Sequence, residues 1–248
     1  MTPFLDLPER SAKPRETGIT SVLDRGLSLA EVDGLVEVAG NSVDFVKLGW
    51  GTALATGNLD RKLERYRAHG LPVVCGGTLT ELAIAQDRVE PMVEWLKKLG
   101  LEHIEVSDGT IVLEHARKLE LIDRLARDFT VFSEVGSKDD ERIMAPYRWV
   151  EQISAELEAG AWKVVAEARE SGTVGLYRHD GEVRMGLVDE IAHEIDPTRL
   201  VFEAPLKAQQ VWFLKRFGPN VNLGNIAPDD VLSLETLRLG LRSDTMRA

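Results

Sequence analysis

The stretch HIEVSDGTI, residues 103–111, has the pattern of a short buried strand that runs into a turn. Ile104 and Val106 alternate with Glu105, and Asp108 follows just past the end of the strand. Successive side chains of a strand point to opposite faces, so Glu105 points away from its apolar neighbours. A carboxylate near the end of a buried strand is costly unless it is compensated, so it matters whether other strands carry one too.

The same pattern, a short apolar run followed by a longer amphipathic segment, occurs eight times along the chain. The expected strands cover residues 19–24, 44–49, 71–77, 103–109, 130–136, 162–172, 199–204 and 221–225. The helices expected after them cover about 29–40, 58–70, a long segment ending at 98, 111–128, 145–159, a segment ending near 194, 206–217 and 229–240. Such alternation predicts parallel strands joined by right-handed crossovers. Eight units in 248 residues favour an α/β fold of the closed (βα)8 TIM-barrel type over an open doubly wound sheet.

The chain shows no linker or low-complexity segment that would divide it into several domains. Residues 1–17 are rich in Pro, Arg and Lys, and we expect them to form an N-terminal arm outside the repeat. Residues 18–248 then form the barrel, because barrels of this kind commonly use about 250 residues as one domain.

The composition argues against several classes of partner. The formal net charge is −11, and an acidic chain without a basic tract is a poor ligand for nucleic acid or an anionic membrane. No run reaches the roughly 18 apolar residues of a membrane span, and the first residues lack the apolar core of a signal peptide. Cys75 is the only cysteine, which excludes an intramolecular disulfide. We therefore expect a cytoplasmic protein, and a homo-oligomer because barrels of this kind often associate.

Ionisable side chains lie near the C-terminal ends of five of the eight expected strands. They are Lys47, Glu105, Glu134, Glu167 and Glu203. In (βα)8 barrels this end is the mouth where active sites lie, although the pattern alone does not fix which side chains point inward. Any one of these glutamates could simply form an ion pair at a solvated rim. Four on consecutive strands favour compensation by a cation.

A divalent cation would compensate such a cluster. Mg²⁺ typically takes one or two carboxylates and completes its shell with water or substrate oxygens. The candidate ligands are Glu105, Glu134 and Asp108, of which the first two lie at corresponding positions of neighbouring strands.

Basic side chains at the strand ends indicate an anionic substrate. They are Lys47, Lys138, Arg169 and Lys207. Together with backbone N–H groups at helix starts, they could hold a multiply charged anion. Gly224 and Asn225 end the expected eighth strand and lead into the last helix, where this fold usually binds phosphate, although Gly224 could serve only a tight turn. Glu203 completes this set of candidate substrate-binding residues.

Several other chemistries are excluded by position. The segment GWGTAL, residues 49–54, has Leu54 where a dinucleotide-binding motif needs a third small residue. Lys163 could suggest a Schiff-base lysine, but it begins its strand about 13 Å from Glu167 and so belongs to the opposite end of the barrel. Cys75 is expected to be a buried apolar residue rather than a nucleophile.

Seven segments, taken together, resemble one protein family. They are PRETGITSVLDRGL, DFVKLGWGTAL, GGTLTELA, IEVSDGTI, EVGSKD, EARESGTVGLY and FEAPLKAQQVWFLKRFGPNVNLGNI. They occur in order from about Pro14 to Ile226, and in them the chain resembles the phosphosulfolactate synthases. The resemblance implies a (βα)8 barrel and a Mg²⁺-dependent addition of sulfite to phosphoenolpyruvate, in coenzyme M or sulfolactate biosynthesis. It also implies that Lys138 is the acid that protonates the carbon beside the substrate carboxylate.

Two alternatives remain open. One is a different enolate-forming barrel lyase that acts on a related phosphorylated acid, and sulfite dependence would distinguish it. The other is a non-catalytic role, because the resemblance extends to plant heat-stress-associated proteins. In that case removal of Lys138 would change nothing measurable except stability.

Overall fold

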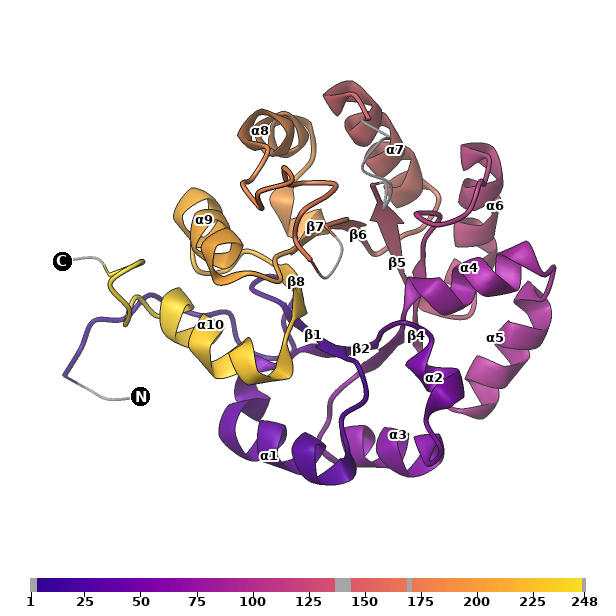
Figure 1. Cartoon of the computed structure of the whole chain (residues 1–248), viewed down its shortest axis with the longest axis horizontal. Helices are drawn as coiled ribbons and strands as arrows, with labels where there is room; N and C mark the ends of the chain where they lie inside the picture. The colour runs from indigo at the N-terminus through magenta and orange to yellow at the C-terminus, as the bar shows by residue number, and fades with distance from the viewer. Residues whose placement is uncertain (1–3, 137–143, 169–170, 247–248) are drawn as a thin grey trace.

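Eight parallel strands close into a barrel, and each strand pairs with the next in chain order until β8 returns to β1 (Figure 1). The computed structural model describes residues 4–136, 144–168 and 171–246, and the barrel lies within them. The strands are β1 (Thr20–Asp24), β2 (Phe45–Leu48), β3 (Val73–Cys75), β4 (His103–Val106), β5 (Thr130–Val135), β6 (Lys163–Ala166), β7 (Leu200–Glu203) and β8 (Leu223–Ile226). The (βα)8 barrel expected from the sequence is therefore confirmed, and the open sheet is excluded.

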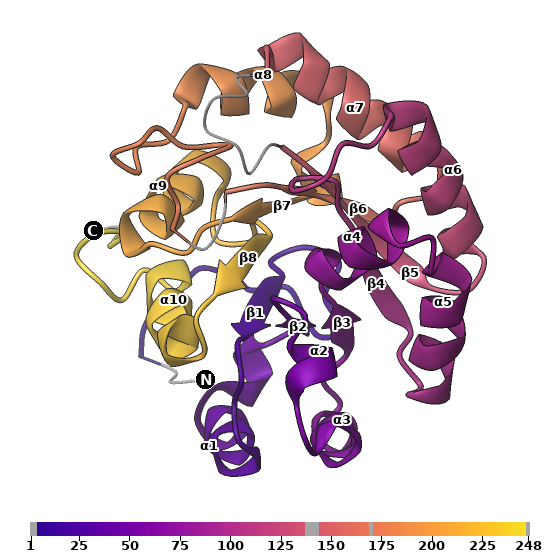
Figure 2. The same cartoon turned by 45° about the vertical axis from the view of Figure 1, so that its right-hand side comes forward.

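Helices surround the strands on the outside of the barrel (Figure 2). They are α1 (Leu29–Ala39), α2 (Thr52–Ala55), α3 (Leu59–Ala68), α4 (Gly77–Ala85), α5 (Val89–Lys98), α6 (His115–Ala126), α7 (Pro146–Glu158), α8 (Met185–Glu194), α9 (Lys207–Phe217) and α10 (Val231–Arg238). Short 3₁₀ turns lie at Gly40–Ser42, Pro197–Arg199 and Pro228–Asp230. None of the helices in the described part of the chain is long and apolar enough to span a membrane.

Local sequence signals account for several helix ends. A capping box starts α1, where Ser28 Oγ accepts the Glu31 N–H at 3.3 Å and the Glu31 carboxylate accepts the Ser28 N–H at 2.7 Å. Pro146 occupies the first position of α7, where its missing N–H costs nothing. Gly218 ends α9 with a φ of +87°, a conformation that favours glycine.

Three expected element boundaries were wrong. The long helix ending at Lys98 is two helices, because Asp87 adopts a left-handed φ of +53° between α4 and α5. The helix expected from residue 111 begins only at His115, and the strand expected over 162–172 ends at Ala166. The periodicity of apolar residues continues through such breaks, so it does not mark them.

The sheet buries one apolar layer on each of its faces. The inner face carries Ile19, Phe45, Val74, Phe132, Val165 and Val201 in one cluster. Aromatic rings dominate it, with the Phe45 and Phe132 centroids 5.3 Å apart and Trp162 5.2 Å from Phe132. The larger outer cluster packs between strands and helices. The inner layer fills the barrel below its mouth, so polar residues beyond it on the same face must line the mouth.

Residues 4–17 form no helix or strand and run along the barrel beside α10 (Figure 1). Arg10 anchors them, because its guanidinium pairs with Glu235 at 2.9 Å and donates to the Gly18 carbonyl at 3.0 Å. The division into an arm and a barrel domain stays an interpretation of the sequence.

Candidate active site

The ionisable residues at the strand ends point into the barrel. Lys47 lies two residues after the inner-layer residue Phe45, and Glu134 lies two residues after Phe132. Glu167 and Glu203 follow Val165 and Val201 with the same spacing. Residues two apart in a strand share a face, so all of these side chains lie on the inner face, one layer above the apolar floor.

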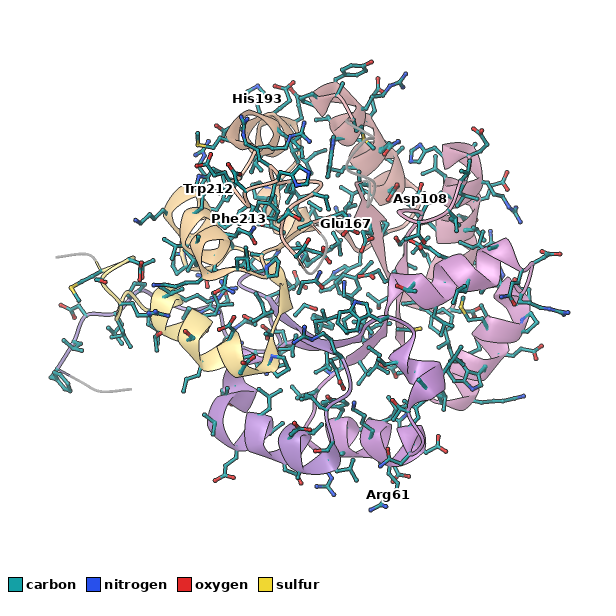
Figure 3. All side chains as sticks on the ribbon, in the orientation of Figure 1. Arg61, Asp108, Glu167, His193, Trp212 and Phe213 are labelled. Atoms are coloured by element: carbon teal, nitrogen blue, oxygen red, sulfur yellow. The ribbon has the colours of Figure 1, made fainter. Side chains whose placement is uncertain are left out.

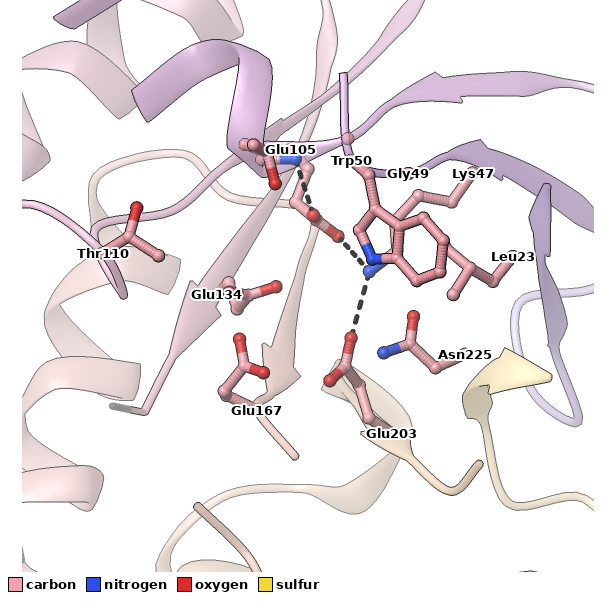
Figure 4. A pocket seen from close by; sticks show the side chains of 13 residues that line it. Leu23, Lys47, Gly49, Trp50, Glu105, Thr110, Glu134, Glu167, Glu203 and Asn225 are labelled. Atoms are coloured by element: carbon pink, nitrogen blue, oxygen red, sulfur yellow. Dashed lines mark hydrogen bonds and ion pairs between the residues drawn. The ribbon is translucent and has the colours of Figure 1, made fainter. Parts of the chain in front are cut away.

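Together these side chains line a pocket of about 260 Å³ at the mouth of the barrel (Figure 4). Its lining residues are Leu23, Lys47, Gly49, Trp50, Gly76, Gly77, Thr78, Glu105, Thr110, Glu134, Glu167, Glu203 and Asn225. In the view with all side chains, Glu167 lies within the ring of helices, whereas Arg61 and His193 lie on the outside (Figure 3). Acidic side chains from four strand ends therefore converge on one pocket.

Lys47 is the cation at the centre of this pocket. Its ammonium lies 3.1 Å from Glu105 Oε2 and 3.0 Å from Glu203 Oε1. Burial alone would lower the pKa of Lys47, but Glu105, Glu203 and the nearby Glu134 raise it well above its usual value. The side chain is therefore held in its charged form.

Glu105 is fixed by both of its oxygens. Besides the contact with Lys47, its Oε1 accepts the Gly77 N–H at 2.8 Å, at the start of α4. A side chain at Gly77 would place its Cβ 2.6 Å from the Ser107 Cβ, so only glycine permits this approach. Burial, opposed by Lys47 and reinforced by Glu134 and Glu203, raises the pKa of Glu105 to about 7.

Glu134 is held from the loop that follows β4. Its carboxylate accepts a hydrogen bond from Ser107 Oγ at 2.8 Å. Ser107 also contacts Glu81, a buried residue of α4, and Thr110 donates to Glu81 as well. Glu81 thus connects α4 to the loop that carries Ser107 and Thr110.

Glu203 is fixed by the chain that follows β6. Its Oε2 accepts the Ala168 N–H at 3.0 Å, and its own carbonyl accepts from the Tyr177 hydroxyl. The buried Glu203 side chain is therefore held both by Lys47 and by the segment that begins at Glu167.

A bulge in β8 aims Asn225 at the pocket. Thr20 of β1 pairs with Leu223 of β8 and Val22 pairs with Ile226, so β8 advances three residues where β1 advances two. Asn225 has a left-handed φ of +53°, and its buried Oδ1 has no hydrogen-bond partner among the described residues. Bulges that redirect a side chain are common next to active sites.

Gly224 and Asn225 were expected where the eighth strand leads into the last helix. Both lie within β8, which continues to Ile226. Asn225 still lines the pocket, whereas Gly224 lies below it at the barrel interior. A Cβ at Gly224 would come 3.1 Å from Val201 Cγ1, so glycine serves close packing against β7 rather than a turn.

The structure brings together Lys47, Glu105, Glu134, Glu203 and Asn225 from the residues expected to form the site. Asp108 and Lys207 are not among the lining residues. Asp108 pairs with Lys118 of α6 at 2.8 Å, and Lys207 is half exposed and pairs with Asp244 at 2.8 Å. Lys138 and Arg169 lie outside the described residues, so their expected roles stay predictions.

Lys163 and Cys75, which the sequence placed outside the site, lie as expected. Lys163 lies at the opposite end of β6, where its ammonium donates to the Thr198 carbonyl at 2.6 Å. Cys75 is fully buried, and burial raises the pKa of its thiol to about 12. Neither residue belongs to the pocket.

Four residues of the site were not expected from the sequence, namely Trp50, Gly77, Glu81 and Thr110. The segment GWG was interpreted only as an incomplete dinucleotide-binding motif, although an aromatic residue between two glycines after a strand is itself unusual. Glu81 lies on a helix, and its contact with the loop after β4 depends on how α4 packs against β4.

A closed (βα)8 barrel with a buried lysine and converging carboxylates at its C-terminal mouth defines a barrel enzyme. The model of the family described as (2R)-phospho-3-sulfolactate synthase (ComA) matches residues 8–244. The chain is 44% identical over 244 residues to the phosphosulfolactate synthase of Bacillus subtilis, covering 97% of each protein. It is 42% identical to that of Methanothermobacter thermautotrophicus, covering 96% of this chain and 95% of the relative. The chain belongs to the phosphosulfolactate synthase family.

Two weaker similarities complete the comparison. The chain is 24% identical to Protein HEAT-STRESS-ASSOCIATED 32 of Arabidopsis thaliana, covering 95% of this chain and 90% of that protein. It superimposes on phosphonopyruvate hydrolase in complex with oxalate and Mg²⁺ with a TM-score of 0.55 and 15% identity, covering 87% of this chain and 77% of the other. At that identity the likeness shows the fold alone.

Proposed function

We propose that this chain catalyses the Mg²⁺-dependent addition of sulfite to phosphoenolpyruvate, which gives (2R)-phospho-3-sulfolactate. The relatives named phosphosulfolactate synthase support this proposal. The observation that carries it is the pocket in which Lys47, paired with Glu105 and Glu203, lies beside two further carboxylates. Such a site joins fixed positive charge to oxygen ligands for a hard cation, and a reaction between two anions needs both.

The oxygen donors of the pocket are suited to bind Mg²⁺ through two carboxylates. Among the described residues, no three His, Cys, Asp or Glu side chains are arranged to hold a metal ion. Mg²⁺ accepts one or two carboxylates together with water and substrate oxygens. We assign Glu134 of β5 and Glu167, which follows the neighbouring strand β6, because both line the pocket (Figure 4). Glu105 is assigned to the ion pair instead, because both of its oxygens already accept hydrogen bonds.

When bound, Mg²⁺ supplies a Lewis acid for the negative charge that develops on the substrate carboxylate. Sulfite attacks the methylene carbon of phosphoenolpyruvate and forms the carbon–sulfur bond. The electron pair of the double bond moves toward the carboxylate, giving an enolate-like anion. Lys47 lies close enough to the pocket to stabilise this charge, and Glu105 and Glu203 hold its ammonium in place.

A proton on the carbon beside the carboxylate completes the reaction. We assign its delivery to Lys138, on the family resemblance of the segment EVGSKD. The addition is then balanced, because the double bond is replaced by one carbon–sulfur bond and one carbon–hydrogen bond and the phosphoryl group stays on its oxygen. The product would enter a sulfonate-forming route such as coenzyme M or sulfolactate biosynthesis, in the cytoplasm.

A mass-spectrometric assay tests the proposal. Purified protein is incubated with phosphoenolpyruvate, sulfite and Mg²⁺, beside an EDTA control, Lys138→Ala and Lys163→Ala. Lys163→Ala is the matched control, since it removes a lysine from the opposite end of the barrel. We expect phosphosulfolactate that depends on sulfite and Mg²⁺, is lost in Lys138→Ala and is kept in Lys163→Ala.

Other outcomes would show which part of the proposed function is wrong. Equal product from Lys138→Ala would keep the reaction and exclude that lysine as the acid. Turnover of phosphoenolpyruvate without sulfite would indicate another enolate-forming lyase. Absence of any product would favour a non-catalytic role, which the similarity to the plant heat-stress-associated protein makes a specific alternative.

A further inference from the structure

Trp50 has a backbone conformation that bulky residues rarely adopt. It lies between Gly49 and Gly51 in the loop after β2, with a φ of +55°. The left-handed region is strained for an L-residue, and such conformations cluster at ligand-binding sites. Gly51 follows with a φ of +69°, so two consecutive left-handed residues turn the chain at this point.

This conformation places the indole at the pocket mouth. Trp50 lines the pocket together with Lys47 and Leu23 (Figure 4). A Cβ at Gly49 would come 2.5 Å from Leu23 Cδ1, so glycine lets the loop pack directly against β1. Half of Trp50 remains exposed, and a molecule in the pocket would meet the ring.

Arg25 stacks on the same ring. Its guanidinium carbon lies 5.5 Å from the Trp50 ring centroid, within the range of a cation–π contact. The backbone beside Arg25 is fixed, because the buried Asp24 carboxylate accepts the N–H groups of Gly26 at 2.7 Å and Leu27 at 2.8 Å. The loop is therefore anchored while the Arg25 side chain extends over Trp50.

The hydrogen-bond donors of Arg25 are not used within the protein. Its guanidinium makes no hydrogen bond or ion pair with any residue in 4–136, 144–168 or 171–246. A guanidinium that stacks on a ring keeps its N–H groups in its own plane, where they can bind an oxyanion in a bidentate manner. By contrast, Lys47 already contacts two carboxylates.

We propose that Arg25 and Trp50 form the subsite for the phosphoryl group of the substrate, with Arg25 binding the oxyanion and Trp50 holding Arg25 in position. The charge distribution favours this placement. The described lining residues include four glutamates and one lysine, so the interior stays negative even with Mg²⁺ bound and disfavours a dianionic phosphoryl group. Arg25, which stacks on the lining residue Trp50, offers it a cation with unused donors. This inference rests on the proposed function, because it assigns one end of that substrate.

Steady-state kinetics with the two substrates varied separately test the subsite. We expect Arg25→Gln to raise the KM for phosphoenolpyruvate at least about 10-fold and to leave the KM for sulfite unchanged. Arg25→Lys keeps the charge but loses the planar stack, so we expect a smaller rise. Arg61→Gln is the matched control, since Arg61 is an exposed arginine of α3 on the outside of the barrel (Figure 3), and it should change neither constant.

A double-mutant cycle separates positioning from bulk. Trp50→Ala should raise the KM for phosphoenolpyruvate, and adding Arg25→Gln to it should have less effect than in the wild type, because the stack is already lost. Thermal midpoints of these variants should stay within about 2 °C of the wild type, since Arg25 is exposed and Trp50 is half exposed. An unchanged KM for phosphoenolpyruvate in Arg25→Gln, an equal rise in the KM for sulfite, or full additivity would overturn the proposal.

Calorimetric titration tests the subsite independently of the proposed reaction. Phosphoenolpyruvate and inorganic phosphate are each titrated into the wild type and Arg25→Gln without sulfite. Weaker binding of both ligands to the variant supports the subsite even where the wild type forms no phosphosulfolactate, an outcome that would refute only the proposed reaction. Equal binding by the two proteins, or no binding to either, overturns the subsite.

Discussion

The ammonium of Lys47 lies 3.0 Å from Glu203 Oε1, so a side chain of β2 meets a side chain of β7 across the interior of the barrel. The same ammonium reaches Glu105 of β4 at 3.1 Å. These three strands are not neighbours in the sheet. One lysine thus joins separate sides of the mouth, and the carboxylates around it are held close together only because it is charged.

Replacing Lys47 should abolish activity without unfolding the barrel. In Lys47→Met the glutamates lose their central cation and the substrate loses a positive charge, so we expect turnover to fall at least about 100-fold. The thermal midpoint should also fall, because Glu105 and Glu203 are left buried without their partner. Lys163→Met removes a buried lysine from the other end of the barrel and should keep its turnover. Wild-type turnover in Lys47→Met would contradict this placement of the site.

Metal dependence should change in only some of the acidic variants. We expect Glu134→Gln and Glu167→Gln to raise the Mg²⁺ concentration for half-maximal activity at least about 10-fold, because each removes one proposed oxygen ligand. Asp108→Asn should leave that concentration unchanged, since Asp108 pairs with Lys118 away from the pocket. Titration of Mg²⁺ into EDTA-treated protein measures all three. The reverse ranking would restore Asp108 as a ligand.

Asp24 should contribute strongly to the stability of the fold. It is fully buried at the end of β1, forms an ion pair with the buried Lys62 and accepts from the Tyr66 hydroxyl at 2.8 Å. Asp24→Ala leaves the Lys62 charge buried without a partner and should lower the free energy of unfolding by about 3 to 5 kcal/mol. Tyr66→Phe removes one hydrogen bond and should cost about 1 to 2 kcal/mol.

Urea unfolding provides the measurement for Asp24. Asp33→Asn is the control, because the Asp33 ion pair with Arg65 lies at the surface and its loss should leave the unfolding free energy almost unchanged. If Asp24→Ala were as stable as Asp33→Asn, the buried network would not be a stabilising element.

Lys163 should make stability rise with alkaline pH. Burial lowers the pKa of its ammonium from 10.5 to about 8. Between these pH values the unfolded chain binds more protons at this lysine than the folded chain, so the folded state gains stability as pH rises. The wild type should therefore gain stability relative to Lys163→Met from pH 8 to 10.5.

Unfolding free energies of both proteins across this range measure the difference. Lys98→Met, at an exposed lysine of α5, provides the baseline for replacing a lysine. A difference between wild type and Lys163→Met that is constant, or that falls with pH, would show that burial does not disfavour the charge.

Local patterns were sufficient to predict the barrel but not its breaks. Eight strand–helix units could be identified because a buried parallel strand is an apolar run and a covering helix is amphipathic. The break at Asp87 and the bulge at Asn225 were missed, since each depends on one residue in a left-handed conformation that apolar periodicity does not reveal. The late start of α6 was missed because the apolar residues continue through 111–113, ahead of the helix.

The site was only partly predictable, because local sequence reveals residues at strand ends but not how the helices and loops pack around them. Glu105, Glu134 and Glu203 could be proposed because each follows a strand-like run, and Lys47 likewise. Asp108 has an equally suggestive position in the sequence, yet it pairs with Lys118 because α6 packs against β4 and β5. Arg25 and Trp50 come from loops after different strands, and no spacing connects them.

The sequence by itself determined the order of strands and helices, the family and the kinds of side chain at the strand ends. These depend on periodicity and residue type, which are local properties of the chain. Only the tertiary structure decided which of those side chains share a pocket and which pair elsewhere. Closure of the barrel sets the register between strands distant in sequence, and that register places Lys47 between Glu105 and Glu203 while leaving Asp108 and Lys207 outside.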